Sequence, residues 1–261
     1  MQLKWGDKMG KIITIANQKG GVAKTTTAIN LSASMALLNK KVIVVDMDPQ
    51  GNATSGLGVD KLKMGRCIYD CLINEIPVGN IIQPTKIDTL FVVPASMQLA
   101  GAEVELVSVI ARETKLKKIL ENVREDYDYI IIDCPPSLGL LTLNAMTAAD
   151  GILIPIQCEY YALEGLSQLM NTIKLVKKHL NKNLEIFGAV LTMFDARTNL
   201  SIEVVDEVKT YFKEKVFQSI IPRNVRLSEA PSHGLPINIY DPKSKGAEQY
   251  LELAKEVIER D

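Results

Sequence analysis

The chain has 261 residues, and 47% of them are hydrophobic, which is enough for one core of ordinary size. Its 30 basic and 31 acidic residues leave a net charge of −1. That balance excludes a globally basic nucleic-acid binder, so any contact with DNA must come from a local patch. Four cysteines are too few for a disulfide scaffold, and we expect reduced thiols.

The N-terminal residues 1–8 contain no apolar stretch of the kind that signal peptides have. We expect them to be a flexible extension, and residues 9–261 to form a single domain. No run of about 18 apolar residues occurs in the chain, so no membrane-spanning helix is expected.

The first motif lies between an apolar run at 12–16, typical of a strand, and a helical pattern at 28–38. Its sequence is NQKGGVAKTTT. A glycine-containing turn between a strand and a helix is the setting of a phosphate-binding loop, because main-chain N–H groups there face an anion. Lys24 adds a positive charge, and Thr25 a hydroxyl for Mg²⁺.

This loop departs from the usual pattern, G-x-x-x-x-G-K-[ST], because position 18 is Gln and position 23 is Ala. It also has a second lysine, Lys19, beside the two glycines. Two lysines near one phosphate chain are more than one site needs. We favour a ligand role for Lys19 over that of a solvated surface charge.

The rest of the chain alternates strands and helices. Short β-branched runs predict strands at 41–45, 90–94, 129–133, 152–156, 186–193 and 216–221. Apolar spacing predicts helices at 67–75, 97–111, 114–123, 163–178, 202–211 and 246–259. The alternation predicts a single-domain α/β fold, a mostly parallel twisted sheet with helices on both faces. In such sheets a ligand binds at the carboxyl ends of the strands.

Aspartates follow two of the predicted strands. Asp133 ends an isoleucine-rich run, and we interpret it as the carboxylate of a Mg²⁺ site. Asp48 follows the second strand and is a candidate for orienting or activating a water. Asp46 lies closer to that strand and either supports the metal or caps the turn. Beside Lys24 and Thr25, these residues predict phosphoryl-transfer chemistry.

Five segments together resemble the ParA/Soj family of chromosome- and plasmid-partitioning ATPases, which have a deviant Walker A motif. The resemblance runs from Met9 to about Ala254, and its segments are KGGVAKTTT, DMDPQGNATSGLG, IIIDCPPSLGLLTLNA, CEYYALEGL and IPRNVRLSEAPSHG. It implies a P-loop NTPase fold and a weak intrinsic ATP hydrolase that a partner protein stimulates. It also implies ATP and Mg²⁺ as ligands.

The same resemblance implies a role for each motif residue. Lys19 is the signature lysine, which reaches across a nucleotide-sandwich homodimer to the partner's ATP. Lys24 holds the β- and γ-phosphates, Asp48 is needed for hydrolysis, and Thr25 and Asp133 serve the metal. The residues implied to contact the nucleotide are Lys19, Gly20, Gly21, Val22, Ala23, Lys24, Thr25, Thr26, Pro222 and Asn224. The family usually has Gly where this chain has Ala23.

Family members bind double-stranded DNA without sequence specificity in their ATP form. The matching arginines are Arg197 and Arg226, whereas we expect Lys243 and Lys245 to be solvated charges. The resemblance implies a ParB/Spo0J-like centromere-binding partner and a cytoplasmic, nucleoid-associated protein that drives chromosome or plasmid partitioning.

Other function classes remain open at this point. A MinD-like membrane-associated positioning ATPase needs a basic amphipathic C-terminal helix. Here the polar face of that helix is acidic and its apolar residues are expected to face the sheet, so no membrane contact is expected. A nucleotide-switched regulator that acts by protein contact is the second alternative. A nitrogenase-type iron protein needs cluster-bridging cysteines, and Cys134 is not at the expected spacing.

Overall fold

A computed structural model describes residues 9–159 and 165–261. The expectation for residues 1–8, the middle of the CEYYALEGL segment and the predicted start of the helix at 163 lie outside these ranges. The described residues form one sheet of eight strands in the order β3-β4-β2-β5-β1-β6-β7-β8. The strands are β1 (Lys11–Ile15), β2 (Val42–Asp46), β3 (Gln83–Pro84), β4 (Leu90–Val93), β5 (Tyr129–Asp133), β6 (Gly151–Gln157), β7 (Glu185–Phe194) and β8 (Val216–Pro222).

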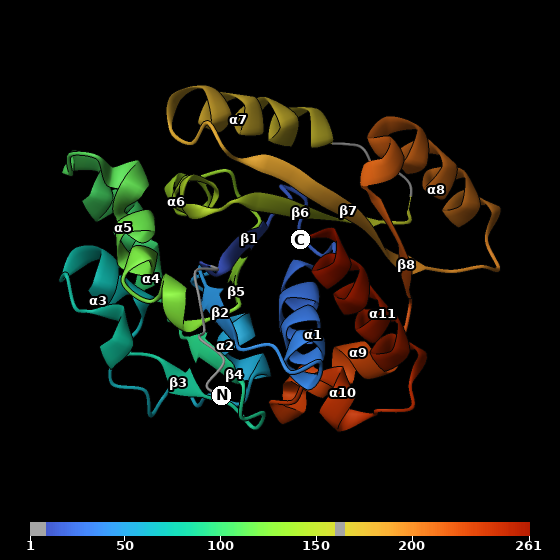
Figure 1. Ribbon diagram of the computed structural model, residues 1–261, viewed down its shortest axis with the longest axis horizontal. Coiled ribbons are helices and arrows are strands. Elements are labelled where there is room, and N and C mark those ends of the chain that lie inside the picture. The colour runs from blue at the N-terminus through green and yellow to red at the C-terminus, as the bar shows by residue number, and fades with distance from the viewer. Residues whose placement is uncertain (1–8, 160–164) are drawn as a thin grey trace, which may run out of the picture.

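Adjacent strands are parallel except at the β3–β4 edge, which is antiparallel. Helices cover both faces of the sheet (Figure 1). The α-helices are α1 (Lys24–Leu37), α2 (Asn52–Gly56), α3 (Ile68–Ile73), α4 (Leu99–Glu105), α5 (Lys115–Glu121), α6 (Leu140–Ala148), α7 (Leu166–His179), α8 (Asn199–Phe212), α9 (Val225–Glu229), α10 (Ile237–Tyr240) and α11 (Lys245–Arg260). The predicted α/β fold class is confirmed.

The core has two layers because neighbouring residues of a strand point to opposite faces of the sheet. On β5, Ile130 and Ile132 pack in the layer covered by α3 to α8, whereas Ile131 packs in the layer covered by α1 and α9 to α11. The central strands are therefore buried on both sides, which is why they appear in the sequence as continuous apolar runs.

Several elements differ from the sequence-based expectation. Helix α1 begins at Lys24, four residues before the predicted start, and α2 lies at Asn52–Gly56, where no helix was predicted. Helix α6 was not predicted, because most of its residues are buried and it has no polar stripe to reveal a helical period. The predicted helix 97–111 is shorter: α4 ends at Glu105, and a 3₁₀ turn continues it to Ser108.

The C-terminal helix α11 packs against α1 and β8 (Figure 1). Its side chains Tyr250, Leu253, Ala254 and Val257 are fully buried, as expected for a core-facing stripe. Leu251 and Ile258 are only half-buried. Within residues 9–159 and 165–261, no helix combines the length and the apolar character that crossing a bilayer requires.

Candidate functional site

The glycine-containing turn between β1 and α1 is hydrogen-bonded to two neighbouring strands, β6 and β7. The Asn17 side-chain amide donates to the carbonyl of Pro155 on β6 (2.8 Å), and its oxygen accepts from the N–H of Lys19 (3.1 Å). On the other side, the Thr192 hydroxyl of β7 donates to the carbonyl of Val22 (3.2 Å). These contacts hold the loop in one shape at the carboxyl end of the sheet.

Two residues of the loop have left-handed backbone conformations. Gly21 has φ 74° and Ala23 has φ 66°. Ala23 is the N-cap residue of α1 and its side chain makes no capping bond. A residue with a Cβ in this conformation costs roughly 1–2 kcal/mol. Glycine adopts this conformation without a steric cost, so Ala23 holds the turn at a cost in backbone strain.

Lys24 is the first residue of α1, and it is largely buried. Its ammonium donates to the carbonyl of Lys19 (2.9 Å). Burial lowers the pKa of Lys24, whereas the negative charge of Asp133 acts in the opposite direction, as do Cys134 and Asp48. The start of a 14-residue helix adds to the positive potential. The loop therefore presents a lysine and main-chain N–H groups to one anion-binding region.

Asp133 is the last residue of β5 and is completely buried. Neither carboxylate oxygen has a hydrogen-bond partner among the described residues. Burial, followed by the nearby Asp46 carboxylate, raises the pKa of Asp133 well above its usual value, and the neighbouring Thr25 and Lys24 oppose that rise. A buried carboxylate without donors is the group that a bound cation satisfies. Asp133 and the Thr25 hydroxyl are the residues that would hold Mg²⁺, because this ion prefers hard oxygen ligands.

Asp46 and Asp48 lie at the end of β2, beside β5. Asp46 is paired in register with Asp133. One Asp46 oxygen accepts from the N–H of Asp48 (3.1 Å), and the other accepts from Thr54. These are the hydrogen bonds of a residue that caps a turn. Asp48 itself is mostly buried, and one of its oxygens accepts from the N–H of Gln50 (2.9 Å). Its second oxygen has no partner in the described part of the chain.

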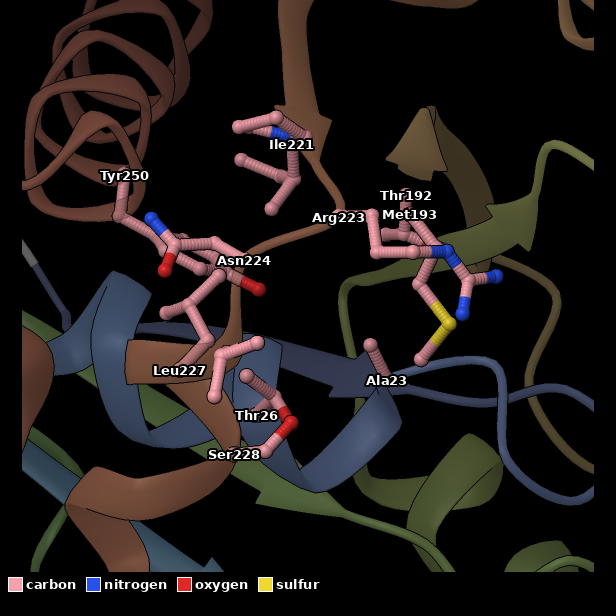
Figure 2. A pocket seen from close by; sticks show the side chains of 12 residues that line it. Ala23, Thr26, Thr192, Met193, Ile221, Arg223, Asn224, Leu227, Ser228 and Tyr250 are labelled. Carbon is pink, nitrogen blue, oxygen red and sulfur yellow. The ribbon is translucent and has the colours of Figure 1, made fainter. Parts of the chain in front are cut away.

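A pocket opens beside the loop, between the start of α1 and the ends of β7 and β8 (Figure 2). Pro222 and Asn224, which the family resemblance implies to contact the nucleotide, both line it. Eight of the twelve lining residues were not predicted from the sequence. Three of the eight, Thr192, Met193 and Tyr250, belong to elements whose sequence is typical of ordinary core. The full lining is Ala23, Thr26, Thr192, Met193, Ile221, Pro222, Arg223, Asn224, Val225, Leu227, Ser228 and Tyr250.

The pocket combines an apolar wall with amide and hydroxyl groups, the combination typical of small-molecule binding sites. Figure 2 shows Ala23 and Thr26 facing Ile221 across it. Asn224 is the N-cap residue of α9, and its side-chain oxygen accepts from the N–H of Arg226 (2.9 Å). Its NH₂ group has no partner in residues 9–159 and 165–261, and it remains available to a ligand.

The two predicted DNA-binding arginines lie just beyond the ends of neighbouring strands. β7 and β8 end side by side, where the N–H of Arg223 donates to the carbonyl of Phe194 (2.9 Å). Arg197 follows β7, and its exposed guanidinium pairs with Asp195 (2.6 Å). Arg226 is in α9 after β8 and pairs with Glu229 (2.9 Å). Both arginines are exposed on the same end of the sheet as the loop.

Comparison with known proteins decides the family. Residues 10–186 match the family model described as an AAA domain. The chain is 64% identical to the sporulation initiation inhibitor protein Soj of Bacillus subtilis over 249 residues, which is 95% of this chain and 98% of Soj. The chromosome partitioning protein ParA of Myxococcus xanthus is 58% identical, over 97% of this chain and 89% of that protein.

The chain belongs to the ParA/Soj family of partitioning ATPases. The resemblance inferred from its motifs is confirmed. The fold of this ParA/Soj protein also matches a crystal structure of cobyrinic acid a,c-diamide synthase from Mycobacterium smegmatis with bound ADP and magnesium. That match has a TM-score of 0.85 and 37% identity, and it covers 96% of this chain and 94% of the synthase.

Proposed function

We propose that this ParA/Soj protein is an ATP-driven switch that partitions a chromosome or plasmid. It binds ATP with Mg²⁺, forms a homodimer in that state, and then binds double-stranded DNA without sequence specificity. One observation carries the proposal: in a chain 64% identical to Soj, Lys24 and Asp133 lie close enough for their charges to interact, with Asp48 beside them. Phosphoryl transfer needs this combination of a cradle, a metal ligand and a water-orienting group.

The nucleotide binds along the edge formed by the loop and the pocket. The adenine lies against Pro222 and Asn224, and the phosphates meet the loop N–H groups from Lys19 to Thr26. The Lys24 ammonium exchanges the Lys19 carbonyl for phosphate oxygens, which are stronger acceptors because they are charged. Asp48 orients the attacking water with its free oxygen. Thr25 and Asp133 would hold Mg²⁺, which would supply neutralisation of the phosphate charge when bound.

Lys19 serves the nucleotide of a second copy of the chain. Its main-chain groups bond within the loop, but its side chain has no polar partner among the residues that the structure describes. That free ammonium supports the cross-dimer role that the family resemblance implies. Intrinsic hydrolysis is slow, and a ParB/Spo0J-like centromere-binding protein stimulates it, so that the ATP dimer persists until its partner acts.

Arg197 and Arg226 form the DNA contact, and dimerisation doubles their number on one assembly. A protein with a net charge of −1 then binds phosphates through a local patch. The protein acts in the cytoplasm and on the nucleoid. It does not act on a membrane, and the buried apolar stripe of α11 supports this, because Tyr250, Leu253 and Val257 are not available to lipid.

Retention on DNA at low salt, measured with ATP, with ADP and without nucleotide, tests the proposal. We expect the wild-type protein to be retained on DNA only when ATP is present, and not with ADP or without nucleotide. Asp48→Ala should form an ATP dimer that stays on DNA, because binding survives and hydrolysis stops. Sedimentation with liposomes and ATP should recover no protein. Equal DNA retention in all three nucleotide conditions would contradict a DNA switch, and no retention would favour a regulator that acts by protein contact.

A further inference from the structure

Thr54 lies in α2, eight residues after Asp46, and is completely buried. Its hydroxyl donates to Oδ2 of Asp46 (2.7 Å), and its main-chain N–H donates to the same oxygen (2.8 Å). The hydroxyl in turn accepts from the N–H of Ala95, in the segment that follows β4 (2.9 Å). One side chain thus joins α2 to the ends of two neighbouring strands.

The direction of these hydrogen bonds is forced. The main-chain N–H of Ala95 can only donate, so the Thr54 oxygen accepts from it. An ionised Asp46 oxygen can only accept, so the Thr54 hydroxyl donates to it. The other Asp46 oxygen accepts from the N–H of Asp48 (3.1 Å). A continuous set of hydrogen bonds therefore runs from Ala95 through Thr54 and Asp46 to the backbone of Asp48.

The surroundings leave little freedom for this set to move. The N–H of Gly51 donates to the carbonyl of Asp48 (2.9 Å), closing the turn between Asp48 and α2. A Cβ on Gly51 would stand 2.9 Å from the carbonyl oxygen of Ala95, so the turn and the β4 end are closely packed. Asp46 is also next to Asp133 across the β2–β5 pair. Its hydrogen bonds to Thr54 hold it on the α2 side against the repulsion between two carboxylates.

We propose that Thr54 is a positioning residue for ATP hydrolysis, acting through Asp46 on Asp48. Without the Thr54 hydroxyl, Asp46 loses a donor and the buried N–H of Ala95 loses its acceptor. The Asp48 turn is then no longer held in register with the phosphate loop, although the loop and the pocket keep their own contacts. The inference rests on the proposed role of Asp48 as the residue that orients the attacking water.

Three substitutions of Thr54 separate the effect of its hydroxyl group from the effect of its side-chain shape. Thr54→Val keeps the shape and removes the hydroxyl, Thr54→Ser keeps the hydroxyl, and Thr54→Ala removes the hydroxyl without adding bulk. Thr147→Val is the matched control, because Thr147 is also buried but its hydroxyl donates only within its own helix, to Leu143 (2.7 Å). Steady-state ATP hydrolysis, nucleotide affinity and the thermal midpoint are measured for each variant.

We expect Thr54→Val to lower kcat by roughly ten-fold or more, with KM for ATP within about two-fold of wild type. Thr54→Ser should recover most of the rate, and Thr147→Val should keep it. If Thr54→Val does not fold, Thr54→Ala carries the same expectation. A wild-type kcat in the variant without the hydroxyl, or an equal loss in Thr54→Ser, would overturn the inference. So would a raised KM with an unchanged kcat.

The variant Asp48→Ala distinguishes a wrong inference about Thr54 from a wrong proposed function. If Asp48→Ala hydrolyses ATP at the wild-type rate, the proposed role of Asp48 is wrong and the role of Thr54 is wrong with it. If Asp48→Ala is inactive while Thr54→Val is fully active, only the inference about Thr54 is wrong.

Discussion

The ammonium of Lys24 donates a hydrogen bond to the main-chain carbonyl of Lys19, 2.9 Å away. The two lysines of the loop therefore have different surroundings. Lys24 is buried at the start of α1 and points back into its own loop, whereas the Lys19 side chain has no polar partner in the described part of the chain. This difference fits the two separate tasks proposed for these lysines, which are binding the chain's own nucleotide and reaching a second chain.

Substituting each lysine should separate these tasks. Lys24→Ala should lose ATP binding, because it removes the charge at the phosphates, and it should lose ATP-dependent dimerisation as a consequence. Lys19→Ala should bind ATP as a monomer but should not dimerise. Equilibrium nucleotide binding and size-exclusion chromatography with light scattering measure the two properties. Normal ATP binding by Lys24→Ala would show that the loop is wrongly assigned.

The strain at Ala23 should be visible in stability. Ala23 has φ 66°, where glycine carries no steric cost. We expect Ala23→Gly to raise the free energy of unfolding by up to about 1 kcal/mol, because the relieved strain exceeds the added flexibility of the unfolded chain. Chemical denaturation without nucleotide measures the change, and a less stable Ala23→Gly would contradict the strain argument.

Gly21→Ala is the matched reverse change for Ala23→Gly. Gly21 has φ 74°, and a Cβ added there would meet no other atom within 4 Å. Because no clash contributes, the substitution should destabilise the protein by about 1 kcal/mol through backbone strain alone. The same denaturation experiment measures it, and an unchanged free energy of unfolding would show that this loop tolerates a Cβ without strain.

The carboxylates that pair with Arg197 and Arg226 should compete with DNA phosphates for these arginines. Arg197 holds the pKa of Asp195 well below its usual value through hydrogen bonds, and Arg226 lowers that of Glu229. Because both arginines are exposed and the two carboxylates are only partly buried, phosphates can displace the carboxylates at little cost. Arg197→Ala and Arg226→Ala should weaken DNA binding and reduce its salt dependence by about one counterion for each arginine lost, with the ATP dimer intact.

Lys255→Ala is the control for the arginine variants, because it also removes one exposed, ion-paired positive charge, here on α11 (Lys255–Glu252, 2.7 Å). It should bind DNA with the wild-type salt dependence. If an arginine variant loses the ATP dimer together with DNA binding, that arginine supports the assembly and not the DNA contact.

The buried carboxylates should make stability depend on pH. Burial raises the pKa of Asp46 from 3.8 to about 6, with hydrogen bonds from Thr54 opposing it. The folded state therefore binds more protons than the unfolded state between these values, and the free energy of unfolding should fall as pH rises through that window. The fall attributable to Asp46 is on the order of 2–3 kcal/mol.

Denaturant unfolding in the absence of Mg²⁺ measures this dependence. A range of roughly pH 4 to 7 covers the unfolded and folded pKa values of Asp46. Asp46→Asn should flatten the curve, because an amide does not titrate there. Asp133, whose pKa is raised in the same direction, should contribute to the remaining slope. An identical slope in the wild type and in Asp46→Asn would show that Asp46 does not titrate in this range.

The sequence by itself determined the family and every strand of the described sheet except β3, and it predicted a phosphate loop. Runs such as Ile130–Ile132 are buried on both faces of a parallel sheet, so their apolar pattern is continuous and unambiguous. The loop and its lysines are contiguous, and their chemistry can be recognised without a structure. Asp133 and Asp48 follow strands, and the carboxyl ends of parallel strands meet at one edge.

Only the tertiary structure decided the rest. Helix α6 is buried on most sides and α2 is only five residues long, so neither has a periodic pattern. The pocket draws Thr192 and Tyr250 from elements far apart in the chain, and no local signal marks them. The bond from Ala95 to Thr54 joins residues 41 positions apart. Such contacts depend on the order of strands in the sheet, which side-chain spacing along a single chain does not encode.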